Sequence, residues 1–527
     1  MDPSVLPLNK SNMVMRIAMP VRLRALLALV FALHMLLGAS LGLSVDEAHY
    51  ALYAAHPALS YFDHPPLVGW AQWPLVVLDA PTVVLRLVPG LLWLGTVLLV
   101  YRLAVRLCAD RGRAVQTQAG FWAVVTLLLA PLLHILGIGL LPDTLLMFWS
   151  AALMLQTLRL MARVHVAGVA QWLLLGLLLG LAGLSKYTAI FTALAVALCL
   201  LGAHGLVLLR KPGLWLAIVL ALALVSPVAV WNAQNHWVSF VYQAKHGAGS
   251  SWHALNLARF LLVQALAFGP LLGWGGVGVR SVGTGERMVL AFFVIPFVVL
   301  AYLSGGGSSL PHWTAPAWVA LAPFAGIGLA RCWDAGKRLR VKALMLLQAL
   351  ACVALPAIML SAGMPFMEGK TASAEFSDAP NPFADLHGWD AAGARAKTLA
   401  ARQGLDAVAV QNWTLASRIG WYARPLKVHV LEDRFDQFDL WAGKLAVGGS
   451  ALLVDWSQLP YETPLGAHGF AQCRKLESLE VRRLGYAVSS FDFYACRGWS
   501  GQPEPRLKSS AAKAAEPASA PDALTKP

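Results

Sequence analysis

Acidic residues gather at the ends of apolar stretches in this 527-residue chain. Asp46 and Glu47 follow the first stretch, Asp63 lies in the segment after them, and Asp143 comes immediately before a later stretch. A carboxylate at the border of a hydrocarbon layer is partly desolvated, which is the setting that tunes a general base. Asp and Glu also favour the first turn of a helix, where they cap it. A catalytic and a capping interpretation therefore both stay open.

Other polar residues stand at similar positions. Lys186 lies between two apolar runs, where a cation can snorkel to water or hold an anionic group such as a phosphate. The segments 231–237 and 311–316 are amphipathic and rich in aromatic residues, which an aromatic belt at the membrane surface would also explain. No nucleotide-binding loop or metal-binding motif stands in a supporting context, so a nucleotide-driven cytoplasmic enzyme has no support.

The composition identifies the class of protein that positions these residues. Hydrophobic residues make up 58% of the chain and charged residues 13%, whereas a soluble domain is about 25% charged. The net charge of +14 could suggest nucleic-acid binding, but residues 1–361 hold 23 Lys and Arg against 9 acids, and residues 362–527 hold 18 of each. The excess lies between the apolar stretches, as membrane topology requires. We predict a polytopic membrane protein that binds no nucleic acid.

About 11 apolar runs are long enough to cross a bilayer, which takes about 20 residues. They lie near 25–43, 83–101, 119–138, 144–158, 170–184, 188–207, 213–230, 257–278, 288–303, 314–330 and 343–361. Short runs between 160 and 210 leave room there for a re-entrant segment. Nineteen Lys and Arg fall in alternate loops, whereas the other loops hold Lys186 and Lys245. The positive-inside rule then predicts a cytoplasmic N-terminus and an external C-terminal domain.

The predicted domains are a transmembrane domain over 1–361 with a long outer loop at 44–82, a small α/β domain over 362–500, and a disordered tail over 501–527 that is rich in Pro, Ala, Ser and Lys. In the α/β domain we expect helices at 386–404 and 414–423, and strands at 405–411, 426–431, 451–455 and 491–496. Cys473 and Cys496 both lie in this domain, where a disulfide can persist, with two buried thiols as the alternative.

Taken together, the polar segments resemble those of bacterial polytopic glycosyltransferases of the protein O-mannosyltransferase and lipid A aminoarabinose transferase superfamily. The matching strings lie at 46–50, 61–66, 141–143, 184–187, 231–240, 312–317 and 436–441, and the resemblance as a whole covers about residues 20–500. This resemblance implies a mainly α, GT-C-type fold in the bacterial inner membrane. It also implies transfer of a sugar from a polyprenyl-phosphate donor to an acceptor on the outer face, with inversion at the anomeric carbon.

The resemblance further implies roles for individual residues. Asp46 matches the presumed general base, and Asp143 matches a second acid that helps to hold the acceptor or the sugar. The aminoarabinose transferase has Glu-Lys where this chain has Asp63-His64, so Lys186 becomes the better candidate for the donor phosphate. The remaining candidates are His64 and Arg86 for the phosphate, and Glu47, Asp63, Tyr61, His312 and Trp313 for the acceptor or the sugar.

Several alternatives stay open. We expect no required cofactor, although a divalent metal bridging Asp63 and a histidine such as His312 is a hypothesis without a ligand spacing to support it. Lipid A or another envelope glycan is the expected acceptor, ahead of protein. A transporter or flippase of a lipid-linked sugar and a non-catalytic scaffold are the rival functions. Polar groups at the outer border, without a visible repeat, favour the enzyme over the transporter.

Overall fold

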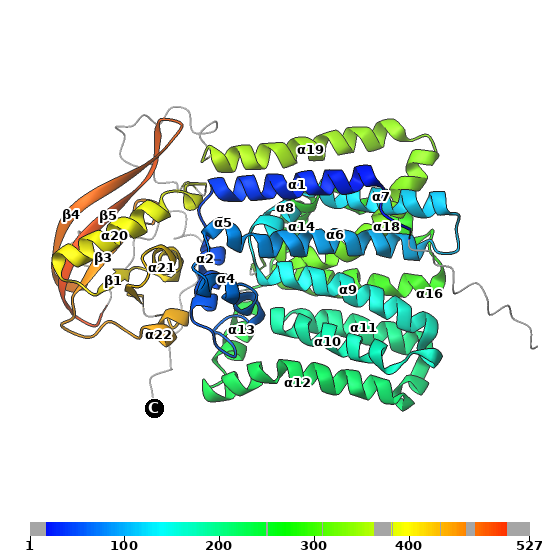
Figure 1. The fold of residues 1–527 in the computed structure, drawn as a ribbon, viewed down its shortest axis with the longest axis horizontal. Coiled ribbons are helices and arrows are strands. Elements are labelled where there is room, and N and C mark those ends of the chain that lie inside the picture. Colours follow the sequence, from blue (N-terminus) through cyan, green and yellow to red (C-terminus); the bar gives the residue numbers. More distant parts are fainter. Residues whose placement is uncertain are drawn as a thin grey trace, which may run out of the picture. The chain divides into compact units, whose positions relative to one another are not determined.

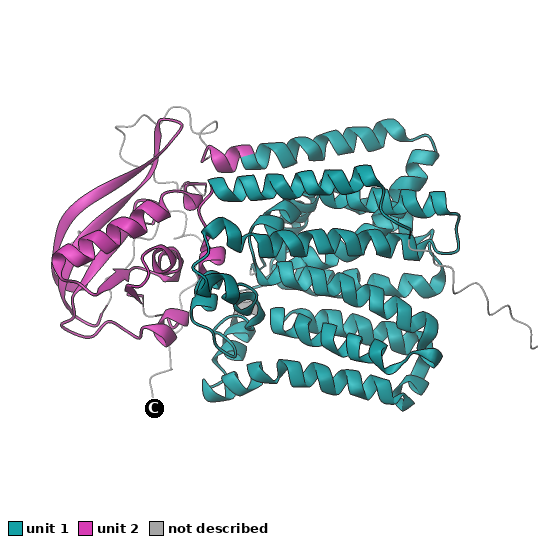
Figure 2. Cartoon of the chain, in the orientation of Figure 1, with its two compact units in different colours: residues 1–40, 50–356 teal, residues 41–49, 357–527 magenta. Residues whose placement is uncertain are grey.

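The computed structural model describes residues 17–248, 251–307, 309–362, 381, 383–432, 434–459 and 469–502. The chain forms two compact units, a helical unit of residues 1–40 and 50–356 and a C-terminal unit of residues 41–49 and 357–527 (Figure 2). The segment 41–49 thus belongs with the C-terminal unit, whereas the sequence analysis placed the whole loop 44–82 in the membrane domain. Nearly all of the expected disordered tail lies outside the described residues.

The helical unit is a bundle of long apolar helices, many of which lie side by side (Figure 1). Among the described residues, eight segments are long and apolar enough to cross a membrane. They are α1 (Val21–Ser40), α5 with α6 (Thr82–Leu85 and Leu87–Leu107), α9 with η1 (Pro142–Arg163 and Val164–Val166), α11 with η2 (Ala189–His204 and Gly205–Arg210), α12 (Pro212–Gln234), α16 to α17 (Thr284–Arg287 and Ala291–Ser304), η5 with α18 (Pro311–Thr314 and Ala315–Asp334) and α19 (Arg338–Leu360). The chain is a multi-pass membrane protein.

The expected 11 spans become eight, or up to ten if each bent helix pair is one span. The first pair, α7 (Arg113–Leu128) and α8 (Pro131–Ile138), is bent by 76°. The second, α14 (Ala254–Phe268) with η3 and α15 (Pro270–Trp274 and Gly275–Val279), is bent by 99°. The remaining expected run forms α10 (Val169–Ser185), which is shorter than the other spans.

The bends arise where proline follows a residue that leaves the helical conformation. Ala130, before Pro131, has an extended ψ of 104°, and Gly269, before Pro270, has a φ of +81°. Proline has no N–H and disfavours the α conformation in the preceding residue, so each helix ends there. The region between 160 and 210, where a re-entrant segment had room, contains the end of α9, η1, α10, all of α11 and η2.

One side chain of α19 satisfies the backbone at both bends. The Gln348 Oε1 atom accepts a hydrogen bond from the Leu271 N–H at 2.9 Å, and its Nε2 donates to the Leu129 carbonyl at 2.7 Å. Backbone groups released from a helix inside a membrane need such partners, because lipid supplies none. The buried Gln348 therefore stabilises both broken helices at once.

The C-terminal unit contains, among its described residues, a five-stranded sheet of order β2-β1-β3-β5-β4. Its strands are β1 (Ala407–Val410), β2 (Lys427–Val430), β3 (Ala451–Trp456), β4 (Phe470–Arg483) and β5 (Tyr486–Trp499). The helices are α20 (Trp389–Gln403), α21 (Trp413–Tyr422) and the short α22 (Gln437–Trp441). β2, β1 and β3 pair in parallel, whereas β5 pairs antiparallel with β3 and β4. The predicted α/β architecture is confirmed.

The sequence analysis missed β4, although it expected both helices α20 and α21 and parts of the other four strands. β4 is an edge strand that alternates apolar residues with many charged ones, which protects an edge from pairing with other chains. That composition hides the strand signal. Cys473 of β4 and Cys496 of β5, directly paired in register, are joined by a disulfide.

Candidate active site

A buried ion pair lies at the start of α9. Asp143 is the second residue of α9, and Lys186 follows the last residue of α10, which packs against α9. The Lys186 Nζ atom lies 2.7 Å from both carboxylate oxygens of Asp143. The two residues are only 5% and 1% exposed. An acid at a helix N-terminus and a cation at a helix C-terminus each complement the helix dipole, so the chain itself favours this pair.

Two residues before α18 complete this group. The His312 Nε2 atom lies 3.7 Å from a carboxylate oxygen of Asp143, and the Lys186 Nζ atom lies 5.3 Å from the centre of the Trp313 ring. We call these four residues the Asp143 cluster. An ammonium group has three N–H donors, and Asp143 accepts two of them. The third can therefore donate to an anionic oxygen, with Trp313 excluding water from one side.

A second group of polar residues, in the segment 50–82 of the helical unit, centres on Asp63. The Tyr53 hydroxyl donates a hydrogen bond to the Asp63 carboxylate, and burial together with this carboxylate raises the pKa of Tyr53 well above its ordinary value. The rings of Tyr53 and Tyr61 stack 3.6 Å apart. His64, next in the chain, lies close enough to His312 for an electrostatic interaction, which links this group to the Asp143 cluster.

Two predicted ligand residues have structural contacts instead. Tyr61 is fully buried, and its hydroxyl donates to the Tyr53 carbonyl at 2.7 Å, so it presents no surface to a sugar. Arg86 is also buried, and its guanidinium donates to the carbonyl of Gly38 in α1. Arg86 thus joins α1 to the start of α6.

Asp46 and Glu47 open α2 (Val45–Ala55), which begins in the C-terminal unit. The Glu47 carboxylate accepts hydrogen bonds from the backbone N–H and the hydroxyl of Ser44, and the Glu47 N–H donates to the Ser44 hydroxyl. This is a capping box, so the capping interpretation accounts for Glu47. Asp46 is the second residue of the same helix and is only partly buried.

The structure also places residues near Asp46 that the sequence analysis did not single out. Arg418 of α21 is 1% exposed and interacts electrostatically with Asp46. Arginine is usually a surface residue, so its burial could not be read from its type alone. One signal was present, because Arg418 is the single charged residue in the otherwise uncharged sequence of α21.

The hypothesis of a bridging metal ion needs a group of ligand side chains. In the part of the chain that the structure describes, no three His, Cys, Asp or Glu side chains are grouped so as to hold a metal ion. The suggested pair, Asp63 and His312, has other neighbours, because Asp63 accepts a hydrogen bond from Tyr53 and His312 lies beside Asp143.

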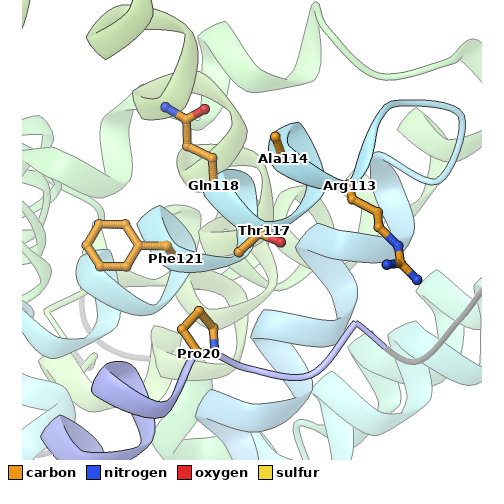
Figure 3. Close-up of a pocket in the computed structure, with 6 residues that line it drawn as sticks. All are labelled: Pro20, Arg113, Ala114, Thr117, Gln118 and Phe121. Atoms are coloured by element: carbon orange, nitrogen blue, oxygen red, sulfur yellow. The ribbon is translucent and has the colours of Figure 1, made fainter.

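A cavity of about 540 Å³ lies elsewhere in the helical unit, before α1 and along the first turns of α7 (Figure 3). Its lining residues are Pro20, Arg113, Ala114, Thr117, Gln118 and Phe121. None of them belongs to the Asp143 cluster.

Comparisons with known proteins show which proteins the chain resembles. Residues 63–231 match the family model described as dolichyl-phosphate-mannose-protein mannosyltransferase. This matched region includes Asp143 and Lys186. Over 308 residues the chain is 26% identical to the lipid A galacturonosyltransferase RgtD of Rhizobium johnstonii, and the alignment covers 56% of this chain and 62% of the relative, less than two thirds of its length.

Solved structures of ArnT from Cupriavidus metallidurans share the fold. The apo form has a TM-score of 0.55 and the form bound to undecaprenyl phosphate 0.56, both at 16% identity. Each match covers 92% of this chain, and 100% and 99% of the respective ArnT chain. The chain therefore has an ArnT-like fold, and over residues 63–231 it is similar to the mannosyltransferase family. The family resemblance and the ArnT-like fold class that the sequence indicated are therefore confirmed.

Proposed function

We propose that this ArnT-like chain is a membrane glycosyltransferase that moves a sugar from a polyprenyl-phosphate donor to a glycolipid of the cell envelope. The observation that carries the proposal is the Asp143 cluster, a buried cation with a spare N–H beside an aromatic ring and a histidine. A chain with the same fold binds undecaprenyl phosphate, as the ArnT structure records. The cluster offers the chemistry that such a phosphate needs.

Lys186 is the proposed ligand of the donor phosphate. When the bond between the anomeric carbon and the phosphate oxygen breaks, negative charge develops on that oxygen and must be stabilised. Asp143 holds the ammonium group in place at 2.7 Å, and the remaining N–H is directed to the leaving phosphate. His312, with His64 within electrostatic range of it, supplies further hydrogen-bond donors.

Asp46 is the proposed general base. The acceptor hydroxyl attacks the anomeric carbon, its proton passes to the Asp46 carboxylate, and the polyprenyl phosphate leaves with the bonding electron pair. Attack from the face opposite the phosphate inverts the anomeric carbon. A partly exposed carboxylate suits this role better than Asp143, whose oxygens are both occupied by Lys186.

The acceptor is proposed to be lipid A or another envelope glycan, because the curated relative is named for lipid A. Protein remains the second choice. The charge distribution of the loops supports a site on the outer face of the bacterial inner membrane, with the N-terminus in the cytoplasm and the C-terminal unit in the periplasm. A flippase, the rival function, finds no counterpart among the named relatives, which are transferases.

The test compares the envelope of a deletion strain with that of complemented strains by mass spectrometry. We expect lipid A or core glycan to lose the mass of one sugar, and wild type to restore it. Lys186→Met should fail to restore it, whereas Lys245→Met, which removes an exposed lysine of an alternate loop, should restore it fully. An unchanged envelope together with accumulated polyprenyl-phosphate sugar would favour the flippase.

A further inference from the structure

Residues 41–49, which carry Asp46, are held by other parts of the C-terminal unit. The Gly42 N–H donates to the Leu386 carbonyl at 3.0 Å, and the Leu43 N–H donates to the Tyr422 hydroxyl at 2.9 Å. A Cβ atom on Gly42 would lie only 2.9 Å from the Leu386 oxygen, so this approach requires glycine. The chain is therefore fixed directly before α2 begins.

The same segment is fixed again after Asp46. The His49 Nδ1 atom lies 3.0 Å from the Ser417 hydroxyl, and both residues are buried. The His49 ring also contacts Trp413 edge-on and packs near Phe438 and Trp441. The anchors thus lie on both sides of Asp46, and those at Ser417 and Tyr422 come from one helix, α21.

A fixed positive charge lies between these two anchors on α21. The Arg418 guanidinium packs 3.8 Å above the Trp389 ring and 5.0 Å above the Trp456 ring, and it forms an ion pair with Asp385. Burial lowers the pKa of Arg418, while the carboxylates of Asp385 and Asp46 counter that shift. A buried guanidinium that packs against two rings and pairs with Asp385 has little freedom to move, so it keeps a fixed positive charge near Asp46.

We propose that α21 is a positioning helix for Asp46, in which Tyr422 and Ser417 hold the backbone of residues 41–49 and Arg418 orients the carboxylate. This inference rests on the proposed function, in which Asp46 is the base. Misplacing a reacting group by about 1 Å can cost about a hundredfold in rate. The C-terminal unit would therefore act on the chemical step, and its contribution to catalysis would go beyond acceptor binding.

The experiment uses the full-length chain with three readouts: envelope product by mass spectrometry, undecaprenyl phosphate affinity of the purified chain, and hydrogen exchange of a peptide covering 41–49. We expect Arg418→Gln to lower product by about 10- to 100-fold, and Arg418→Lys to recover part of it. Tyr422→Phe should speed exchange at Leu43 by about tenfold and lower product similarly. Undecaprenyl phosphate affinity should change by less than about twofold in each, because a positioning defect does not weaken donor binding.

Arg395→Gln is the matched control, because it removes an arginine from another ion pair of the same unit, with Glu477, on α20 and β4. It should match wild type in all three readouts. If Arg418→Gln and Tyr422→Phe both give full product while Asp46→Asn is inactive, α21 is not a positioning helix. The assignment of Asp46 as the base would then still stand. An active Asp46→Asn would overturn the base and with it this inference. Lost affinity for undecaprenyl phosphate in Tyr422→Phe would mean a general folding defect and would also contradict it.

Discussion

Two carboxylates occupy the same local position in this chain and have opposite surroundings. Asp143 and Asp46 are each the second residue of a helix, α9 and α2. Asp143 is 1% exposed and both its oxygens are bound by Lys186, whereas Asp46 is partly exposed and interacts electrostatically with Arg418. A carboxylate whose oxygens are both occupied is poorly placed to take a proton. Helix position alone therefore does not distinguish the two acids, whereas the cation near each of them does.

The largest expected loss of stability comes from removing the Asp143 carboxylate. Asp143→Ala leaves the Lys186 cation buried without a partner, which should cost about 3–5 kcal/mol in the free energy of unfolding. Thermal unfolding of the purified chain, followed by tryptophan fluorescence in detergent micelles, measures it. The double variant Asp143→Ala, Lys186→Met should be more stable than the single one. Equal or greater destabilisation of the double variant would contradict the ion-pair account.

A smaller loss of stability is expected when Gln348, another buried polar residue of the helical unit, is replaced. Gln348→Leu removes the partner of the Leu271 N–H and of the Leu129 carbonyl at the two bends. Leaving buried backbone groups unsatisfied should lower the unfolding free energy by about 2 kcal/mol. Gln118→Leu, which loses a hydrogen bond to Asp334 instead, is the control and should cost much less. Equal melting temperatures for the two variants would refute the role given to Gln348.

A third effect, of about the same size, concerns Asp436 of the C-terminal unit, the unit in which Asp46 lies. Burial raises the pKa of Asp436, the N-cap of α22, from 3.8 to about 6. The folded state then binds more protons than the unfolded state between these values, so stability is full below about pH 4 and falls as the pH rises to about 6. The loss should be about 1–3 kcal/mol. Asp436→Asn keeps the oxygen that accepts from the Phe438 N–H and should remove this dependence. If the unfolding free energies of Asp436→Asn and wild type change in parallel between pH 4 and pH 6, the account of Asp436 is wrong.

The sequence predicted those parts of the fold that depend on local pattern. The apolar runs mark the long helices of the helical unit, and the capping interpretation that was left open for Asp46 and Glu47 holds for Glu47, which forms a capping box with Ser44. Pro131 and Pro270 stood inside expected spans, where their missing N–H could have predicted the bends. The two breaks were nevertheless missed, because hydropathy alone does not distinguish a straight span from a bent one.

The site was less predictable because its contacts join distant residues. Asp143 and Lys186 were each singled out, but nothing in their spacing of 43 residues predicts that they bind each other. Tyr61 and Arg86 were expected at the site because of their chemistry, and tertiary packing gives them structural contacts. Arg418 was missed because its burial depends on two tryptophans from α20 and β3. A residue such as Arg418, whose burial depends on tertiary contacts, can be identified only when the fold is known.

The most direct measurement of the central claim is the lipid A and core glycan mass spectrum of a deletion strain that expresses Asp46→Asn at wild-type levels. Amide replaces carboxylate there without a change in size, so folding and donor binding should persist while proton transfer is lost. We predict that the mass of one sugar stays absent, a loss of about 100-fold or more in product. Restoration of that mass to the wild-type level would contradict the assignment of Asp46 as the base.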